Sequence, residues 1–322
     1  MAAPHPTVAR FLGVPVESGH YESFYLKACK PGERLGVWIR YTVHKRPGAL
    51  PNGSLWVTLF DGAGQGPRAH KETMPGPSAG GDEWIRVGDA TMRPGTAAGS
   101  IDGADWELRF STTEQPLFHL PRGWMYRTRL PRTKLLSPVP AARFDGSLRI
   151  DGRTINVDGW RGMIGHNWGS QHAERWIWLH GLTEGGDWLD AALGKVKLGR
   201  VTTPWVASGA LSLGGRRLAL GGPGRKIEVA ESPERCHFLL SGKGVRVRGS
   251  VTAPRQDLVG WVYADPEGPE HNTVNCSIAD MRLQVEQDGA PERELIVDGG
   301  AAYELGMRER NHGIPIQPFP DG

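Results

Sequence analysis

The sequence GMIGHNWG at residues 162–169, followed by WIWLHG at residues 176–181, is the segment that decides the fold prediction. It brings three of the chain's twelve tryptophans, two histidines and an amide close together. Such residues are costly in a loop unless they are buried or bind something. The glycine-rich half predicts a tight, kinked turn, and the second half alternates with the period of a strand. A kinked turn that leads into an aromatic strand is typical of the mouth of a β-barrel pocket.

The composition is that of an ordinary soluble protein of about two domains. The chain has 322 residues, of which 39% are hydrophobic and 23% charged, and this length is large for one core. The 45 glycines and 25 prolines favour many short strands joined by turns. With 38 basic and 35 acidic residues, the formal charge is only +3. Nucleic acid is therefore not an expected partner.

The chain start and the cysteines predict a cytoplasmic protein. The first six residues, MAAPHP, lack the basic end and the apolar core of a signal peptide. No apolar run approaches the roughly 18 residues of a membrane span. Cys29, Cys236 and Cys276 are far apart and form no CxxC pair, so we interpret them as reduced thiols and not as a zinc or disulfide framework.

Strand-like segments separated by turn residues recur from Tyr21 onward. Residues 115–140 differ, because their five prolines predict a long ordered crossing and not a strand. Residues 143–157 predict a hairpin with Asp151-Gly152 as its two-residue turn. Residues 35–45, LGVWIRYTVHK, alternate so that one face holds Val37, Ile39, Tyr41 and Val43. The other strands expected in this half are residues 54–60, 84–92 and 104–111.

A second run of strands follows the quoted segment. Only residues 277–287 have a competing helical interpretation, and there Met281, Leu283 and Val285 alternate as in a strand. The strands expected in this half are residues 187–201, 207–213, 216–220, 226–229, 236–240, 245–251, 258–263, 275–287 and 303–308. We predict an all-β fold with few short helices: an N-terminal arm at residues 1–16, a first barrel or barrel-like sandwich at 17–175, and a second at 176–322.

A hairpin is expected at residues 184–187, with Gly185-Gly186 as its two central residues. This pairing places His180 opposite Ala191 and makes it the single titratable group on an apolar face, with Trp188 and Asp190 on the other face. Two interpretations of His180 remain open. It is either a core histidine with its hydrogen bonds satisfied, or the polar group of a pocket wall made of tryptophans.

The pair His166-Asn167 also has two interpretations. Beside Trp168, an imidazole and an amide could relay a proton to a bound alkene or carbonyl, and tryptophan faces would stabilise a cationic intermediate. Alternatively, these residues only shape a turn and a bulge. Their concentration in one place favours a function.

Several motif classes are absent from the sequence. It has no GxGxxG opening a βαβ unit, no P-loop and no GxSxG. His166, His172, Glu174 and His180 are close in sequence but match no ligand spacing, so no metal is expected. A mild basic cluster predicts a solvated face or a tether for an acidic ligand group; its members are Arg127, Arg129, Arg132 and Lys134.

The quoted segment resembles the signature of the superfamily that contains carotenoid 1,2-hydratase (hydroxyneurosporene synthase), AttH and tocopherol cyclase. Relatives carry an acidic residue, then Lys or His, then Asp or Asn, then Trp-Gly, and later Trp-x-Trp. Residues 131–146 and 275–279 fit the same resemblance. The residues that match the signature here are His166, Asn167, Trp168, Trp176 and Trp178.

The resemblance implies two lipocalin-like barrels in tandem, with an apolar pocket near their junction. It also implies hydration or cyclisation of isoprenoids by protonation of a double bond, without an organic cofactor, while other members act on or carry hydrophobic molecules. Gly165, however, stands where many relatives have the acidic residue. A glycine cannot protonate anything, so the family route would need Glu174, Asp190 or His166 as a substitute.

We therefore expect a hydrophobic small-molecule ligand of isoprenoid, steroid, polyketide or acyl type. In the enzyme version, His166 or a carboxylate donates a proton, with its pKa raised by burial. The alternatives are a non-catalytic carrier and a structural or protein-interaction module. The candidate catalytic residues are His166, Asn167, Glu174 and Asp190, and the candidate ligand-binding residues are Trp168, Trp176, Trp178, His180 and Trp188.

Overall fold

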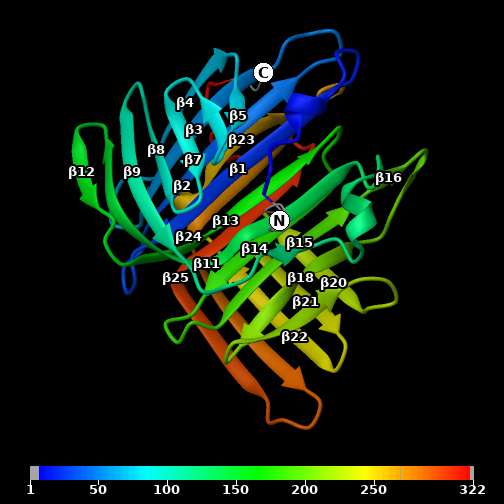
Figure 1. The fold of residues 1–322 in the computed structure, drawn as a ribbon. Helices are drawn as coiled ribbons and strands as arrows, with labels where there is room; N and C mark the ends of the chain where they lie inside the picture. The colour runs from blue at the N-terminus through cyan, green and yellow to red at the C-terminus, as the bar shows by residue number, and fades with distance from the viewer. Residues whose placement is uncertain (1–6, 269, 320–322) are drawn as a thin grey trace.

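The computed structural model describes residues 7–268 and 270–319, and Figure 1 shows their arrangement. These residues form strands and three short 3-10 helices, η1 (Phe11–Gly13), η2 (Gly123–Tyr126) and η3 (Arg255–Asp257), with no α-helix among them. The all-β prediction with few short helices is confirmed. Residues 1–6, on which part of the predicted arm and the signal-peptide prediction rest, lie outside the described residues.

The first sheet is antiparallel and contains thirteen strands. Its hydrogen-bonded order is β4-β3-β2-β1-β13-β11-β9-β8-β7-β6-β5, with β10 and β12 attached to β11. The bounds are β1 (His20–Cys29), β2 (Leu35–Lys45), β3 (Asn52–Asp61), β4 (Arg68–Pro75), β5 (Ser78–Gly80), β6 (Glu83–Val87), β7 (Ala90–Arg93), β8 (Thr96–Ile101), β9 (Ala104–Ser111), β10 (Leu117–Phe118), β11 (Thr133–Ile150), β12 (Arg153–Asn156) and β13 (Trp160–Gly169).

The second sheet closes into a lipocalin-like barrel. Its ring runs β14-β25-β24-β22-β21-β19-β18-β15, closed by the pair Leu220 and Gly242, while β20 and β23 attach outside the ring. The bounds are β14 (Arg175–Leu182), β15 (Trp188–Lys195), β18 (Val206–Leu213), β19 (Arg216–Gly221), β20 (Ile227–Ser232), β21 (Arg235–Gly242), β22 (Val245–Thr252), β23 (Val259–Ala264), β24 (Glu270–Gln287) and β25 (Arg293–Met307), with a small hairpin of β16 (Lys197–Leu198) and β17 (Val201–Thr202).

Strands β1, β2 and β3 are covered on both faces. The four apolar residues predicted for one face of β2 do lie together in the core of the first sheet. Trp38 and Trp56 point the other way and join the core of the barrel. The long strands β24 and β25 (orange to red in Figure 1) bring the barrel against this second face. Side chains on that face, polar ones included, are therefore buried between the two sheets.

Three local predictions were wrong in the first half. Residues 162–169 do not form a tight, kinked turn but lie within the continuous strand β13. Residues 84–92 form two short strands, β6 and β7, separated by Gly88 and Asp89, and Gly88 has a positive φ of 56°. The predicted crossing at 115–140 ends earlier than expected, because β11 already begins at Thr133. Pro138 and Pro140 are accommodated at bulges, since the register to β13 shifts on both sides of Val139.

The predicted Asp151-Gly152 turn is confirmed. Ile150 pairs with Arg153, and the two central residues have φ values of 49° and 77°. Two successive positive φ values are what a two-residue hairpin turn of this type requires.

The hairpin between β14 and β15 exists, but its predicted register was wrong by one residue. The backbone N–H of Thr183 donates to the carbonyl of Asp187 at 2.8 Å, so the loop has three residues and Gly186 takes a φ of 90°. His180 pairs with Asp190, not with Ala191. A one-residue slip moves side chains to the other face. Asp190 therefore lies on the same face as His180, which is not the single titratable group there.

We predict that this loop depends on glycine at one position only. Gly186→Ala should lower the free energy of unfolding by about 1–2 kcal/mol, because a left-handed conformation is strained for an L side chain. The matched control is Gly185→Ala, whose added Cβ meets nothing closer than the Thr183 hydroxyl at 3.8 Å; it should stay within about 0.5 kcal/mol. Urea unfolding measures both, and equal losses would contradict the three-residue loop.

The chain passes from the first sheet to the barrel between Gly169 and Arg175. This is a change of sheet. The division of the chain into two domains at residue 175 stays a prediction. Across the described residues, no helix has the length and apolar character needed to cross a membrane.

Candidate functional site

The candidate site is the junction where the outer face of the barrel packs on the first sheet. Trp178 of β14 meets Tyr25 of β1 edge to face, with ring centroids 5.2 Å apart. Met163 of β13 and Ala302 of β25 pack on the same pair. Trp176 and Tyr25 are only half-buried although both lie between the sheets. Part of each of these two side chains is therefore accessible to solvent.

A row of three residues crosses the first sheet on the face turned to the barrel. Tyr25 pairs with Arg40 of β2 on one side and with Gly165 of β13 on the other. A Cβ added to Gly165 would lie 2.1 Å from Cζ of Tyr25, so the tyrosine ring occupies the space of a side chain at residue 165. This contact is a physical reason for glycine here. It also places a phenol where the resembling proteins carry an acid.

Arg40 is a buried cation in this row and is only 5% exposed. Its Nε donates to Ser23 Oγ at 2.7 Å. Its guanidinium lies over three rings, those of Trp38, Trp56 and Tyr263, at 5.9, 5.3 and 4.1 Å. Nη1 is buried without a hydrogen-bond partner. The described residues give Arg40 no carboxylate partner, which is costly for a buried charge.

Trp176 lies on the barrel side of the junction, where the carboxylate of Glu304 holds its indole ring. Its Nε1 donates to Glu304 Oε1 at 2.8 Å. The other carboxylate oxygen accepts from the Tyr263 hydroxyl and from Asn275 Nδ2, both at 3.1 Å. Glu304 thus fixes two aromatic side chains in place.

Asp190 lies fully buried at the far end of the same wall. Its Oδ2 accepts from Ser137 Oγ at 2.5 Å and lies 3.6 Å from His119 Nε2, and its Oδ1 accepts from Trp178 Nε1 at 3.3 Å. Burial alone raises the pKa of Asp190, but His119, His180 and Ser137 together lower it below its usual value. The expected raised pKa at Asp190 was therefore wrong, and the carboxylate is ionised at neutral pH.

His180 is neutral at neutral pH. Burial lowers its pKa to about 4, with Lys27 adding to the effect. Its Nε2 lies 2.9 Å from the Pro140 carbonyl, so this nitrogen carries the proton and Nδ1 is left without a partner. His180 joins the two sheets through a hydrogen bond, which fits the interpretation of a largely satisfied buried histidine.

The His166 side chain lies on the face of the first sheet that is turned away from the junction. Its ring stacks on Phe24 at 3.9 Å, and its Nε2 lies 2.7 Å from Glu22 Oε1. The Glu22 carboxylate also accepts from the backbone N–H groups of Arg10 and Phe11 at 2.8–2.9 Å. Burial lowers the pKa of His166 despite Glu22, so a proton donor with a raised pKa is not found here. This pair ties the N-terminal arm to the sheet.

The predicted tryptophan wall is split between two places. Trp168 stacks on His166 at 4.5 Å and lies under the Arg10 guanidinium, away from Trp176 and Trp178. Trp188 is buried at the edge of the junction, where its Nε1 donates to Glu114 Oε1 at 3.1 Å. Of the tryptophans predicted for the wall, Trp176 and Trp178 lie together on β14 at the junction.

Asn167 and Glu174, the other two candidate catalytic residues, are both half-buried. Asn167 pairs with Ser23 of β1 and keeps its Oδ1 without a partner, on the junction face. Glu174 forms an ion pair with Arg308, with 3.3 Å between Oε2 and Nη2. Of the three proposed substitutes for the acid at residue 165, only Asp190 lies on the junction face.

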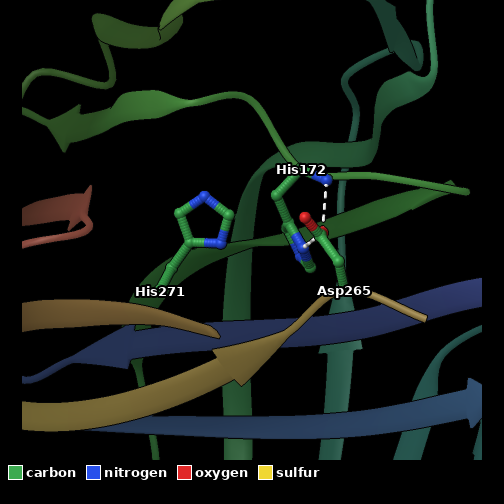
Figure 2. Close-up of side chains that lie close together, drawn as sticks. All are labelled: His172, Asp265 and His271. Carbon is green, nitrogen blue, oxygen red and sulfur yellow. Dashed lines mark hydrogen bonds and ion pairs between the residues drawn. The ribbon is translucent and has the colours of Figure 1, made fainter. Parts of the chain in front are cut away.

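A cluster of three potential metal ligands lies beside Trp176, and Figure 2 shows its members, His172, Asp265 and His271. His172 stacks on Trp176 at 5.3 Å, and His271 meets the same ring edge-on at 4.9 Å. Of the histidine and glutamate residues first considered for a metal, only His172 belongs to this cluster.

Two open clefts lie elsewhere, and neither includes Trp176 or Trp178 in its lining. One, of about 660 Å³, lies between residues 29–34, 182–185 and 294–300. The other, of about 560 Å³, lies on β20, β21 and β22. Both linings mix apolar side chains with several charged ones, so neither cleft matches the expected tryptophan-lined apolar pocket.

Sequence reasoning missed the residues contributed by distant strands, above all Arg40, Tyr25, Glu304 and Glu22. One signal was available for Arg40. The alternation that places four apolar residues on one face of β2 also places Trp38, Arg40 and Thr42 on the other. A tryptophan beside an arginine indicates a covered second face, not a solvated one.

We predict that Glu22 stabilises the fold only while it is ionised. Burial raises its pKa, but hydrogen bonds from His166 and His20 outweigh burial and lower the pKa from 4.5 to about 2. A pKa that is lower in the folded state gives stability above pH 4.5 that is lost as the pH falls toward 2. The free-energy gap between wild type and Glu22→Gln should shrink by about 3 kcal/mol from about pH 6 to about pH 2.

Urea unfolding across this pH range measures the gap. The control is Glu107→Gln, since Glu107 is exposed, and its gap should stay near zero. A pH-independent gap for Glu22→Gln would contradict an ionised tether of the arm.

Comparison with known proteins identifies solved structures that share the fold of this chain. No family model matches the chain. An uncharacterized protein of Mycobacterium tuberculosis, found in two strains, is 27% identical over 305 residues, covering 90% of this chain and 87% of the relative. Two solved structures align over nearly the whole chain.

The first is a candidate AttH protein of Nitrosomonas europaea, with a TM-score of 0.60, 13% identity and coverage of 95% of this chain and 96% of that one. The second is kievitone hydratase of Nectria haematococca, with a TM-score of 0.56, 11% identity and coverage of 95% and 94%. At these identities the likeness concerns the fold. The predicted AttH-like fold is therefore confirmed. Activity on carotenoids or other isoprenoids stays a prediction.

Proposed function

We propose that the protein binds a mostly apolar small organic molecule at the junction of the two sheets and adds water to it or removes water from it. The observation that carries this proposal is Arg40, a buried cation with no carboxylate partner among the described residues. The fold shared with kievitone hydratase supports the reaction class. A member of the isoprenoid, steroid, polyketide or acyl classes would fit, provided that it carries an oxygen group.

Arg40 would anchor that oxygen. A buried guanidinium without a counter-ion costs several kcal/mol, which aromatic faces offset only in part. A ligand carboxylate, phenolate or carbonyl oxygen would accept the free Nη1 hydrogen atoms. The neighbouring Tyr25 phenol is un-ionised, because burial, with Asp190 and Glu304, raises its pKa well above the usual value. It would serve as a second donor.

The aromatic rings would hold the apolar part of the ligand. Trp176 and Tyr25 keep accessible surface between the sheets, and Trp178 packs edge to face on Tyr25. Flat, rigid rings bury large areas of an unsaturated molecule at a low entropy cost.

Hydration of a carbon–carbon double bond needs one base and one donor but no redox partner. The oxygen of water bonds to one carbon as water loses a proton, the other carbon gains a proton, and the π bond is consumed. Ionised Asp190 would accept the proton from water and then, as the acid so formed, deliver that proton to the other carbon, so that no proton is gained or lost overall. Tyr25 and Arg40 would hydrogen-bond to the substrate oxygen and stabilise charge that develops on it.

A carrier function is the second candidate, and a specific observation favours it. The pKa values of Asp190, His166 and His180 are all lowered, so none of these groups is a strong acid poised near neutral pH. A protein that only binds its ligand needs no such group.

Arg40→Met tests the binding site. Without ligand, its free energy of unfolding should stay within about 1 kcal/mol of wild type or rise, because an uncompensated buried charge is removed. Titrations followed by tryptophan fluorescence would use pairs of unsaturated ring compounds that differ by one carboxylate or phenol group. Affinity for the oxygen-bearing member should fall about tenfold or more, with little change for its partner.

The matched control is Arg246→Met, at an exposed residue that pairs with Glu286 on the barrel; it should bind like wild type. Equal affinity in wild type and Arg40→Met, or a loss of several kcal/mol of stability without ligand, would contradict the anchor role.

Incubation of the bound compounds in ¹⁸O-labelled water, followed by mass spectrometry, separates the enzyme from the carrier. Addition of water incorporates one labelled oxygen per product molecule, and removal of water lowers the mass by one water. Asp190→Asn should retain affinity but lose either change. Binding without any mass change in the wild-type protein would identify a carrier.

A further inference from the structure

We propose that His172, Asp265 and His271 form a binding site for one divalent transition-metal ion, with two imidazole nitrogens and one carboxylate oxygen as ligands. This cluster shares no residue with the oxygen anchor proposed above, so either proposal can fail alone. The motif analysis did not predict it, because the three residues come from separate segments.

Three segments converge to form the cluster. His172 lies in the link between β13 and β14, Asp265 directly follows β23, and His271 is the second residue of β24. One potential ligand atom from each lies within 4.8 Å of the other two. Bonds of roughly 2.1 Å at tetrahedral angles would hold ligand atoms on the order of 3.4 Å apart. Each pair of ligand atoms would therefore have to approach by about 1.4 Å at most when an ion binds.

The cluster has unused acceptors that packing alone does not explain. Asp265 Oδ1 accepts from both the backbone N–H and Nδ1 of His172, each at 2.7 Å, while Oδ2 is buried without a partner. Because Nδ1 carries the hydrogen, Nε2 of His172 has a free lone pair and is also buried without a partner. One ring nitrogen of His271 approaches the Ala173 carbonyl. However, neither of its two ring nitrogens makes a hydrogen bond of normal geometry. Figure 2 shows the three side chains close together.

Aromatic packing holds both imidazoles in place. The His172 ring lies between Tyr21, whose centroid is 3.9 Å away, and Trp176, at 5.3 Å. The His271 ring is fully buried and meets Trp176 at 4.9 Å. Ligands fixed in this way lose little conformational entropy on binding a metal.

The donor set favours transition metals over alkaline-earth ions. Imidazole nitrogen suits Zn²⁺, Co²⁺, Ni²⁺ and Fe²⁺, whereas Ca²⁺ and Mg²⁺ prefer oxygen ligands throughout. Three protein ligands leave at least one coordination position for water or for a further molecule.

Cobalt titration of the chelator-treated full-length protein tests the site. One equivalent of Co²⁺ should bind, with visible d–d absorption that saturates at that ratio and is displaced by Zn²⁺. Saturating Zn²⁺ should also raise the midpoint of thermal unfolding, and Ca²⁺ and Mg²⁺ should do neither.

Variants identify the ligands. His271→Ala should lose the absorption and the Zn²⁺-dependent thermal shift, and Asp265→Asn should weaken affinity about tenfold or more. His237→Ala is the matched control, since His237 is an exposed barrel histidine, and it should titrate like wild type. Circular dichroism of each variant without metal checks that it is folded.

Two results would overturn the proposal. One is the absence of stoichiometric Co²⁺ binding by folded wild-type protein. The other is equal binding by His271→Ala and His237→Ala, which would place the ion elsewhere. A loss of stability in Asp265→Asn that is the same with and without Zn²⁺ would assign the cluster a purely structural role.

Discussion

The burial of the outer face of β14 against β1 is the constraint on which the rest of the structure depends. A barrel strand ordinarily turns one face to water, but here Trp178 meets Tyr25 across the two sheets. Polar groups on both facing strands therefore lose water and must find partners within the protein. Asp190 accepts hydrogen bonds from Ser137 and Trp178, whereas Arg40 Nη1 has no hydrogen-bond partner.

Strand alternation separates structural from functional residues along the quoted segment. Residues 164, 166 and 168 lie on the face of the first sheet that is turned away from the barrel. On that face, His166 and Glu22 hold the N-terminal arm. Residues 163, 165 and 167 face the barrel, and there Gly165 leaves room for Tyr25. The two interpretations of the His-Asn pair thus apply to different residues. The imidazole is structural, while the unpartnered amide oxygen of Asn167 faces the junction.

Local patterns predicted the elements well, while pairings across the chain escaped them. The all-β class, the two faces of β2 and the Asp151-Gly152 turn follow from alternation and turn chemistry, which are local. The register of β14 with β15 did not follow, because two- and three-residue loops both suit Glu-Gly-Gly and differ by one position. Glu22 lies far from His166 in sequence, as does Asp265 from His172. No single-sequence spacing encodes such contacts.

Native mass spectrometry of the protein purified from its own host, with organic extraction of anything bound, tests the junction site most directly. The proposed function predicts one small molecule per chain, mostly apolar and bearing a carboxylate, phenol or carbonyl oxygen. An empty protein that also shows no mass shift with isoprenoids, steroids and fatty acids would contradict a ligand site at the junction. That result would leave the interface between the two sheets as a structural feature alone.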